Sequence, residues 1–304
     1  MFVEEELQEL RRERFAPRAA VRSVRALAGR VREAMVANPG AVRSVWALAL
    51  GFFAADFLGA AALVMGAERH LAVSFFLWTA SGIAVAFAAT TLSIDLLRDR
   101  DGFRLSAINV PTALTLLRVA MLPGIVLCLL ERHLALAFAL YAVAMLTDVA
   151  DGWVARRFGQ ITALGTVMDP IVDIVFNLAV LAGLWAAGLL PTWVFATGAL
   201  RYAVLLVGGA CLCLFVGPVR IQPTWFGRMT GVLMSGLVGL LVVLRLRGGA
   251  AGERLVPLTE IALGVLLAAT VVQGVALGWY NFKVMTSEAA TRGRVVGDVR
   301  WGRR

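Results

Sequence analysis

Cysteine and histidine are both scarce in this chain of 304 residues, which contains three cysteines and two histidines. Cys128, Cys211 and Cys213 all fall in long apolar segments. Cys211 and Cys213 are two residues apart, a spacing that points them to different faces of a helix. A disulfide or a zinc site is therefore not expected. His70 and His133 both fall in short loops between apolar segments, which leaves histidine out of acid–base chemistry on the opposite face.

Charged residues are also sparse, at 16% of the chain, whereas hydrophobic residues make up 60% and the mean hydropathy is +0.81. Soluble domains are typically about 45–50% apolar, so this composition excludes one. A helix needs roughly 20 apolar residues to cross a bilayer core. Eight segments of about this length cover residues 44–66, 71–97, 112–131, 134–155, 163–188, 192–216, 229–247 and 255–282. The fold class that we expect is all-α, as a polytopic membrane protein.

The distribution of positive charge predicts the orientation in the membrane. With eight spans both termini lie on one side, and the face that holds them carries 22 of the 29 Lys and Arg residues, against 5 on the opposite face. Arg118 and Arg201 lie within spans. Because positive residues concentrate on the cytoplasmic side, we expect cytoplasmic termini in a bacterial inner (plasma) membrane. The net charge of +9 indicates attraction to anionic lipid, and no nucleic-acid-binding module is visible.

The chain divides into four regions by composition. Residues 1–43 are basic and amphipathic from residue 18 onward, which predicts a helix that lies on anionic lipid at the cytoplasmic surface. Residues 44–108 form an extra transmembrane hairpin and loop, in which Asp56 has no assigned role. Residues 109–282 form a six-span unit, and residues 283–304 form a basic cytoplasmic tail. The first span follows a polar stretch of more than 40 residues, unlike a cleavable signal.

Four aspartates gather in two neighbouring spans, where polar residues are costly and are candidates for function. Asp148 and Asp151 are three residues apart, and Asp169 and Asp173 are four apart, so each pair shares one face of its helix. Only a short connection separates the two spans, so both pairs can converge at one depth. Carboxylates this close need compensation, and hard divalent cations that prefer oxygen ligands supply it. One or two Mg²⁺ or Mn²⁺ ions would leave coordination positions for phosphate oxygens.

Arginine and glycine accompany the first aspartate pair. Arg156 lies about one helical turn after Asp151 and Gly152 and can clamp a phosphate. Gly152 and Gly165 lack side chains at positions where a bulky ligand or another helix comes close. The sequence therefore predicts a phosphate-handling metal site near the cytoplasmic end of these two spans.

The pattern resembles the complete signature of the CDP-alcohol phosphotransferase family, and the resemblance covers about residues 109–282. All eight fixed positions are present with no insertion: Asp148, Asp151, Gly152, Ala155, Arg156, Gly165, Asp169 and Asp173. The run Asn109–Arg118 also resembles the entry of that family into its first span. The resemblance implies a six-helix bundle that transfers a CDP-activated phosphatidyl group from CDP-diacylglycerol to a small alcohol, with release of CMP.

The resemblance also implies a role for each of these residues. Asp148, Asp151 and Asp169 would bind two metal ions, and Asp173 would bind metal and act as the general base. Gly152, Ala155, Arg156 and Gly165 would line the CDP pocket. The base assignment agrees with the residues themselves, because a carboxylate beside cations stays deprotonated and no histidine competes for the role.

The acceptor alcohol is predicted less directly. Asp169-Pro170, preceded by Arg157–Thr162, resembles the phosphatidylglycerophosphate synthase and cardiolipin synthase branch, although Ile174 and Arg201-Tyr202 depart from it. A charged arginine within a span needs an ionic partner. With the aspartates assigned to metal, an acceptor phosphate is the expected partner, and glycerol 3-phosphate is the first choice. The candidate contacts are Arg118, Arg201, Arg220 and Arg228.

Three alternatives stay open. The same chemistry with inositol phosphate, serine or phosphatidylglycerol as acceptor is one. A divalent-cation transporter is another. Its acidic groups would lie near the membrane midplane, whereas the aspartates of this chain cluster near one end of their spans. The third is an inactive scaffold, which the intact signature disfavours. Relatives in the family are commonly homodimers, so the resemblance also implies a homodimer here.

Overall fold

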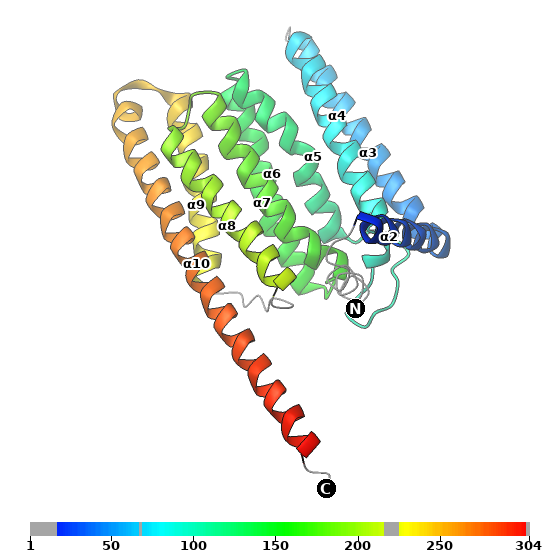
Figure 1. Cartoon of the computed structure of the whole chain (residues 1–304). Coiled ribbons are helices and arrows are strands. Elements are labelled where there is room, and N and C mark those ends of the chain that lie inside the picture. Colours follow the sequence, from blue (N-terminus) through cyan, green and yellow to red (C-terminus); the bar gives the residue numbers. More distant parts are fainter. Residues whose placement is uncertain (1–16, 67–68, 216–224, 302–304) are drawn as a thin grey trace. The chain divides into compact units, whose positions relative to one another are not determined.

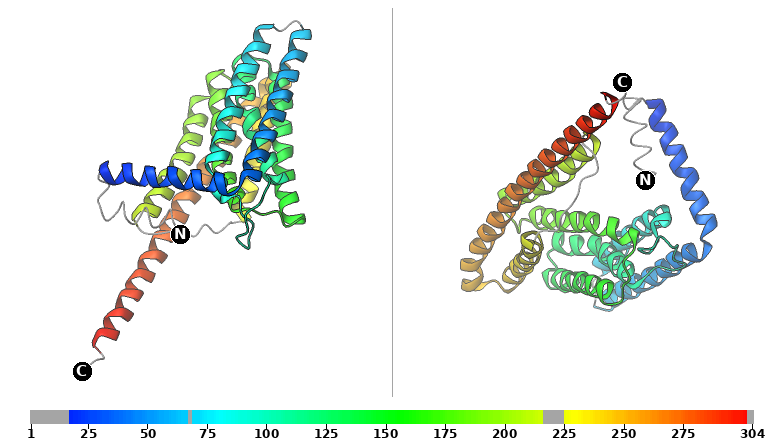
Figure 2. Two further views of the ribbon diagram at one scale, coloured as in Figure 1. Left: turned by 90° about the vertical axis from the view of Figure 1, so that its right-hand side faces the viewer. Right: turned by 90° about the horizontal axis from the view of Figure 1, so that it is seen from below.

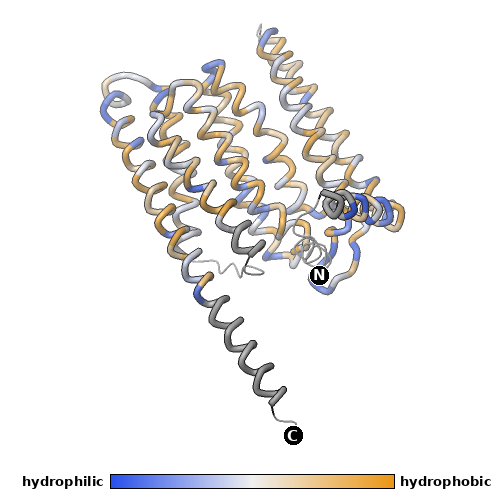
Figure 3. Tube along the Cα trace, in the orientation of Figure 1, coloured by the Kyte–Doolittle hydropathy of each residue, from blue (hydrophilic) through white to orange (hydrophobic). Residues whose placement is uncertain are grey.

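Helices make up most of the part of the chain that its computed structural model describes, which is residues 17–66, 69–215 and 225–301. These residues contain no β-strand, and seven of their helices are long and apolar enough to cross a membrane. Of the eight predicted spans, the one at 192–216 coincides with α8 (Thr192–Phe215), in which Thr192–Gly208 is a shorter apolar helix. Apolar residues follow these helices along most of their length (Figure 3). The predicted all-α membrane fold is confirmed.

The chain forms two compact units, Met1–Ala187 and Gly188–Arg304. The division falls inside the predicted six-span unit at 109–282, whose limits stay a prediction. The helices of the first unit are α2 (Pro17–Ala37), α3 (Pro39–Met65), α4 (Arg69–Leu92), the 3₁₀ turn η1 (Ile94–Leu96), α5 (Val110–Leu130), α6 (Leu134–Arg157) and α7 (Ala163–Ala186). They are labelled in Figure 1.

Helix α2 runs crosswise to the hairpin of α3 and α4 (Figure 2, left). The chain turns from α2 into α3 at Asn38, whose side chain accepts a hydrogen bond from the backbone N–H of Ala41 at 3.2 Å; this turn is the corner between the two helices. This is the N-cap of α3, and Pro39 follows it at a position that proline favours. The Asn38 amide also donates to the carbonyl of Leu105 at 2.8 Å, which ties the corner to the loop before α5.

The hairpin packs on the rest of the unit through close contact of α4 with α5. A Cβ added at Gly82 would lie 2.6 Å from Cγ of Pro123, and one added at Gly124 would lie 2.6 Å from Cε2 of Phe75. Small residues let membrane helices approach in this way, where packing rather than water exclusion drives association. The extra hairpin is thus an integral part of this unit.

The starts of α5 and α7 are held together on the side of the signature residues. Asn109 accepts from the N–H of Thr112 at the start of α5 and donates its amide to the carbonyl of Gln160 at 2.8 Å. Thr162 caps α7 by accepting from the N–H of Gly165 at 3.0 Å. The backbone N–H of Ala163, the residue after Thr162, donates to the carbonyl of Arg98. The loop before α5 and the α6–α7 connection therefore brace each other.

The second unit contains α8, α9 (Trp225–Arg247) and α10 (Gly249–Trp301). A Cβ at Gly264 of α10 would lie 2.1 Å from Cζ3 of Trp193, so the indole of α8 packs directly on the backbone of α10. Arg245 donates to Glu260 at 2.7 Å between α9 and α10. The backbone of α10 continues as one helix through the region predicted as a basic tail from residue 283.

Candidate active site

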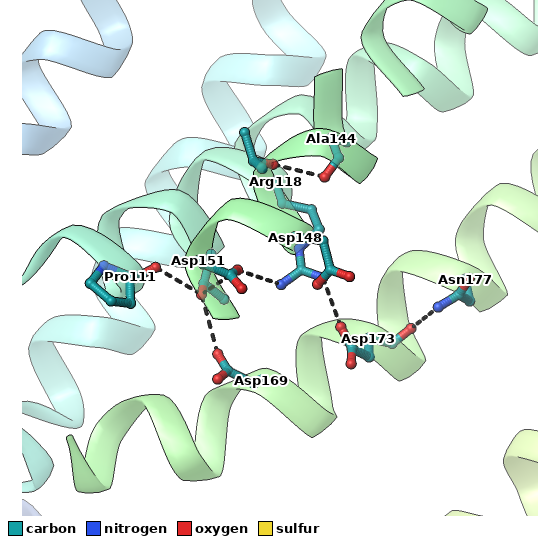
Figure 4. A network of polar contacts seen from close by, with 10 residues as sticks. Pro111, Arg118, Ala144, Asp148, Asp151, Asp169, Asp173 and Asn177 are labelled. Atoms are coloured by element: carbon teal, nitrogen blue, oxygen red, sulfur yellow. Dashed lines mark hydrogen bonds and ion pairs between the residues drawn. The ribbon is translucent and has the colours of Figure 1, made fainter. Parts of the chain in front are cut away.

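Four aspartates meet around one arginine in the first unit (Figure 4). Asp148 and Asp151 lie on α6 and Asp169 and Asp173 on α7, as the spacing of the signature predicts. The close-up shows Asp148, Asp151 and Asp173 turned toward the guanidinium of Arg118, which comes from α5. The carboxylate of Asp169 contacts the hydroxyl of Thr115 instead. Three helices thus contribute charged side chains to one network.

Arg118 is the centre of this network and is only 2% exposed. Its Nη1 donates to Asp148 Oδ1 and, at 2.8 Å, to Asp173 Oδ1. Its Nη2 donates to Asp151 Oδ2 at 3.2 Å. One buried guanidinium therefore links both aspartates of α6 to the second aspartate of α7. Bonds between ionised partners such as these are stronger than neutral hydrogen bonds.

Thr115 extends the network from the same face of α5, one turn before Arg118. Its hydroxyl lies 3.2 Å from Asp169 Oδ1 and 3.5 Å from Asp151 Oδ2, and 3.1 Å from the carbonyl of Pro111. Thr115 was not singled out as a site residue from the sequence. The signal was its spacing, because a residue three positions before Arg118 faces the same neighbours on a helix.

The contacts of Arg118 correct one premise of the sequence-based prediction. The expectation that Arg118 lacks an ionic partner within the protein is wrong, because three of the four signature aspartates bind it. The error arose because the aspartates were assigned to metal alone. A phosphate partner is thus not required to explain an arginine at this depth.

The donor set fits a hard divalent cation, although the present geometry is arranged around Arg118. Three carboxylates pair with one cationic group and the fourth, that of Asp169, lies beside the Thr115 hydroxyl. Carboxylate oxygens are the ligands that Mg²⁺ and Mn²⁺ prefer. Among the residues that the structure describes, no three acidic, histidine or cysteine side chains are grouped closely enough to hold one ion. The guanidinium binds three of these carboxylates, so it would have to withdraw from part of the cluster for them to hold an ion.

The predicted CDP-pocket residues lie beside this network. Arg156 folds back over Gly152, since a Cβ at Gly152 would lie 3.1 Å from Arg156 Nη1. Within the described part of the chain Arg156 forms no ion pair, and its side chain is exposed. A Cβ at Gly165 would lie 3.3 Å from Thr162 Oγ1 and 3.9 Å from Asp169 Oδ2. Ala155 is half-buried on α6.

The predicted acceptor contacts other than Arg118 belong to the second unit. Arg201 on α8 lies over the ring of Tyr202, 5.1 Å from its centroid, and its Nη1 lies 2.9 Å from Met234 Sδ. Its buried Nε has no hydrogen-bond partner, and no described carboxylate forms an ion pair with it. Arg220 lies outside the described residues, as does the side chain of Arg228.

Asp56 is separate from the active-site network. It lies on α3, is buried, and neither of its carboxylate oxygens has a hydrogen-bond partner in the structure. It remains without an assigned role.

Comparison with known proteins gives one family and several relatives. The family model for CDP-alcohol phosphatidyltransferase matches residues 108–283. A probable phosphatidylglycerophosphate synthase of Mycobacterium tuberculosis is 33% identical over 184 residues, which cover 55% of this chain and 78% of that protein. A CMP-forming cardiolipin synthase of Streptomyces coelicolor is 31% identical over 106 residues, 33% of this chain and 49% of that protein.

A third relative is a CDP-diacylglycerol–glycerol-3-phosphate 3-phosphatidyltransferase of Rickettsia bellii. It is 38% identical over 68 residues, which cover 21% of this chain and 38% of that protein. No solved structure matches the chain.

Proposed function

Because the chain belongs to the CDP-alcohol phosphatidyltransferase family, a family of membrane transferases, we propose that it moves a phosphatidyl group from CDP-diacylglycerol to glycerol 3-phosphate with release of CMP. The observation that carries the proposal is the convergence of the four signature aspartates of α6 and α7 in one network. Such a cluster suits phosphoryl transfer, which depends on positioning and on neutralising phosphate charge.

The four signature aspartates would together hold two divalent ions, Mg²⁺ or Mn²⁺. They are Asp148, Asp151, Asp169 and Asp173. Bound there, a divalent cation neutralises phosphate oxygens and orients the diphosphate. Thr115 holds Asp169 and Asp151 in place through its hydroxyl. Arg118 offsets part of the negative charge of the cluster and keeps α5, α6 and α7 in register.

Asp173 is the proposed general base. Its side chain is 53% exposed, whereas that of Asp151 is 11% exposed, so Asp173 is the more accessible to an alcohol. It would take the proton of the acceptor hydroxyl as that oxygen bonds to the β-phosphorus of CDP-diacylglycerol. The bond from this phosphorus to the bridging oxygen breaks, and CMP leaves with that oxygen. A positioned base of this kind typically contributes about 10²–10⁴-fold.

Gly152, Ala155, Arg156 and Gly165 form the proposed CDP pocket. The exposed guanidinium of Arg156, with no ion pair among the described residues, is available to the diphosphate. Gly152 leaves room for that side chain to fold back, because any larger residue would crowd its Nη1. This supports Arg156 as the diphosphate clamp.

Glycerol 3-phosphate is favoured as the acceptor by two observations. Two relatives carry names that specify phosphatidylglycerophosphate synthesis or glycerol 3-phosphate. Arg201 has a buried Nε without a partner and forms no ion pair among the described residues, so an acceptor phosphate is a suitable partner. Arg228 stays a secondary candidate, whereas Arg118 is already paired with three aspartates. The cardiolipin synthase relatives favour phosphatidylglycerol as the second candidate acceptor.

A side-by-side acceptor assay tests this assignment. Purified protein with CDP-diacylglycerol and Mg²⁺ is given glycerol 3-phosphate, phosphatidylglycerol, inositol phosphate or serine, and CMP release is measured. We expect the highest kcat/KM with glycerol 3-phosphate. Arg201→Ala should raise the KM for this acceptor, by about tenfold or more if a charge-assisted contact of roughly 1.5–3 kcal/mol is lost. Arg254→Ala, an exposed arginine of α10, is the matched control. Preference for serine would contradict the assignment.

The membrane arrangement is proposed on the same basis. The protein is an integral membrane protein, and the distribution of Lys and Arg favours cytoplasmic termini and a cytoplasmic active site in a bacterial inner membrane. The amphipathic α2, crosswise to the hairpin, would lie on anionic lipid at that surface. A homodimer is proposed from the family resemblance.

A further inference from the structure

A cavity of about 280 Å³ lies between the extra hairpin and the helices of the active site. Ala86 and Ala89 of α4 form one wall, Leu116 and Val119 of α5 the back, and Met168 and Ile171 of α7 the other wall. Its volume is just below the roughly 300–1,000 Å³ typical of small-ligand sites. It is too small for a nucleotide lipid as a whole and suits a part of one.

The chemistry of the cavity matches hydrocarbon. Its lining is apolar except for Thr90 and Ser93 at the end of α4 and just beyond it. The hydroxyl of Thr90 is already used, because it donates to the carbonyl of Ala86 at 2.8 Å. The rim is open, with Ile171 55% exposed. In a membrane-spanning helix such a rim opens to lipid, so an acyl chain can enter from the side.

The cavity and the active site share two helices, α5 and α7. On α5, Leu116 and Val119 line it while Thr115 and Arg118 belong to the aspartate network. On α7, Met168 immediately precedes Asp169 in the sequence. Adjacent residues of a helix point about 100° apart, so each helix has one face on the charged network and a neighbouring face on the cavity. Both features therefore lie at the same depth.

We propose that this cavity binds an acyl chain of the CDP-diacylglycerol substrate, and that α4 is a substrate-positioning element. The inference rests on the proposed function. If the aspartates hold the CDP headgroup, the glycerol of the lipid lies at the depth of the cavity. One of its acyl chains then starts beside α7. The residues of α4 lie before the matched family region at 108–283, so this wall lies outside that region. It gives the extra hairpin a role.

The expected effect is selectivity for chain length rather than a large gain in affinity. An acyl chain in a membrane is already surrounded by hydrocarbon, so the cavity gains little from the hydrophobic effect. What it adds is packing, which fixes the position of the lipid relative to the aspartates. Small errors in substrate position cost catalysis even when the change is remote from the chemistry.

Filling the cavity tests the proposal. Ala89→Trp places an indole in the cavity from α4, and Ala88→Trp, the adjacent exposed alanine that does not line it, is the control. CMP release is measured with dioleoyl and with dibutanoyl CDP-diacylglycerol, whose short chains cannot fill the cavity. We expect Ala89→Trp to lower kcat/KM about tenfold for the dioleoyl substrate. The dibutanoyl substrate and the control should change less than about twofold. An unchanged ratio between the two substrates in Ala89→Trp overturns the proposal.

Photolabelling supplies a measurement that needs neither a variant nor turnover. The wild-type protein is irradiated with CDP-diacylglycerol that carries a diazirine in its acyl chain, and the labelled residues are mapped. We expect label on α4 and α7 around the cavity, suppressed by excess unlabelled CDP-diacylglycerol but not by phosphatidylcholine. Equal labelling by a diazirine phosphatidylcholine, without that competition, would identify a general lipid groove and overturn the proposal. Failure of the proposed function is separate, since it appears as absent CMP release from either substrate.

Discussion

At the scale of single residues, the charge balance of the network determines what it can bind. The cluster contains four aspartates and one arginine, which pairs with three of them, so it carries an excess of three negative charges when all are ionised. Buried charges need partners, and Arg118 alone does not supply enough. Divalent cations and the arginine together would balance the carboxylates and the incoming diphosphate. The network thus favours metal binding even though its present geometry is closed around Arg118.

Replacing Arg118 tests this charge balance. Arg118→Met removes the central cation and leaves the carboxylates facing one another. In EDTA the variant should melt well below the wild type, because breaking a buried ion pair costs about 3–5 kcal/mol. Mg²⁺ should then raise the Tm of the variant by more than that of the wild type, since a ligand stabilises the state that binds it more tightly. The measurement is thermal unfolding in detergent with and without Mg²⁺.

The control for this experiment is Arg98→Met, which removes a partly exposed arginine paired with Asp95 outside the network. Its Tm should change little, and Mg²⁺ should act on it as on the wild type. If Mg²⁺ shifts the Tm of Arg118→Met no more than it shifts the wild type, the carboxylates do not form the metal site.

Asp173 can be tested apart from the other aspartates. Asp173→Asn keeps the shape of the side chain but removes the proposed base and part of the metal shell. We expect turnover to fall by at least about 10²-fold, with CDP-diacylglycerol binding largely kept. Asp151→Asn should weaken metal and nucleotide binding together.

Binding is followed by competition with a labelled nucleotide lipid, and turnover by CMP release. The control is Asp101→Asn, in the exposed loop before α5. Near wild-type turnover in Asp173→Asn would show that the base assignment is wrong.

At the scale of elements, the sequence predicted the helices well and their packing poorly. Each span is set by its own apolar length, and the breaks at Asn38-Pro39 and Thr162 are local cap signals. The docking of the extra hairpin was not predicted, because it depends on what lies opposite a glycine. Gly82 and Gly124 indicate close helix packing only when the structure shows Pro123 opposite the first and Phe75 opposite the second.

A single methyl group tests this packing. Gly82→Ala would place a Cβ 2.6 Å from Pro123 Cγ, so one helix must shift. We expect a loss of about 1–3 kcal/mol, as for other overpacked positions, read as a lower Tm. Gly59→Ala on α3 is the matched control, because no neighbour lies within 4 Å of its added Cβ. Helix propensity should leave that variant unchanged or slightly more stable. Equal Tm values for the two variants would contradict the close packing of α4 on α5.

At the scale of the whole molecule, the reaction class was predictable and the substrate contacts were less so. The eight signature positions lie within a short stretch of two helices, so their spacing alone indicates a shared site. The partners of Arg118 come from helices 30 to 55 residues away in the chain, and no local pattern encodes which of them it binds. The same holds for the cavity beside α4, which requires three helices to form.

The central claim is that the aspartate cluster carries out metal-dependent phosphatidyl transfer. The most direct test is CMP release by the purified wild-type protein from CDP-diacylglycerol and glycerol 3-phosphate, with Mg²⁺, in excess EDTA, and after Mg²⁺ or Mn²⁺ is restored. Our account predicts that EDTA abolishes CMP release and that either metal restores it, because the ligands available are carboxylates. Undiminished CMP release in excess EDTA would contradict it.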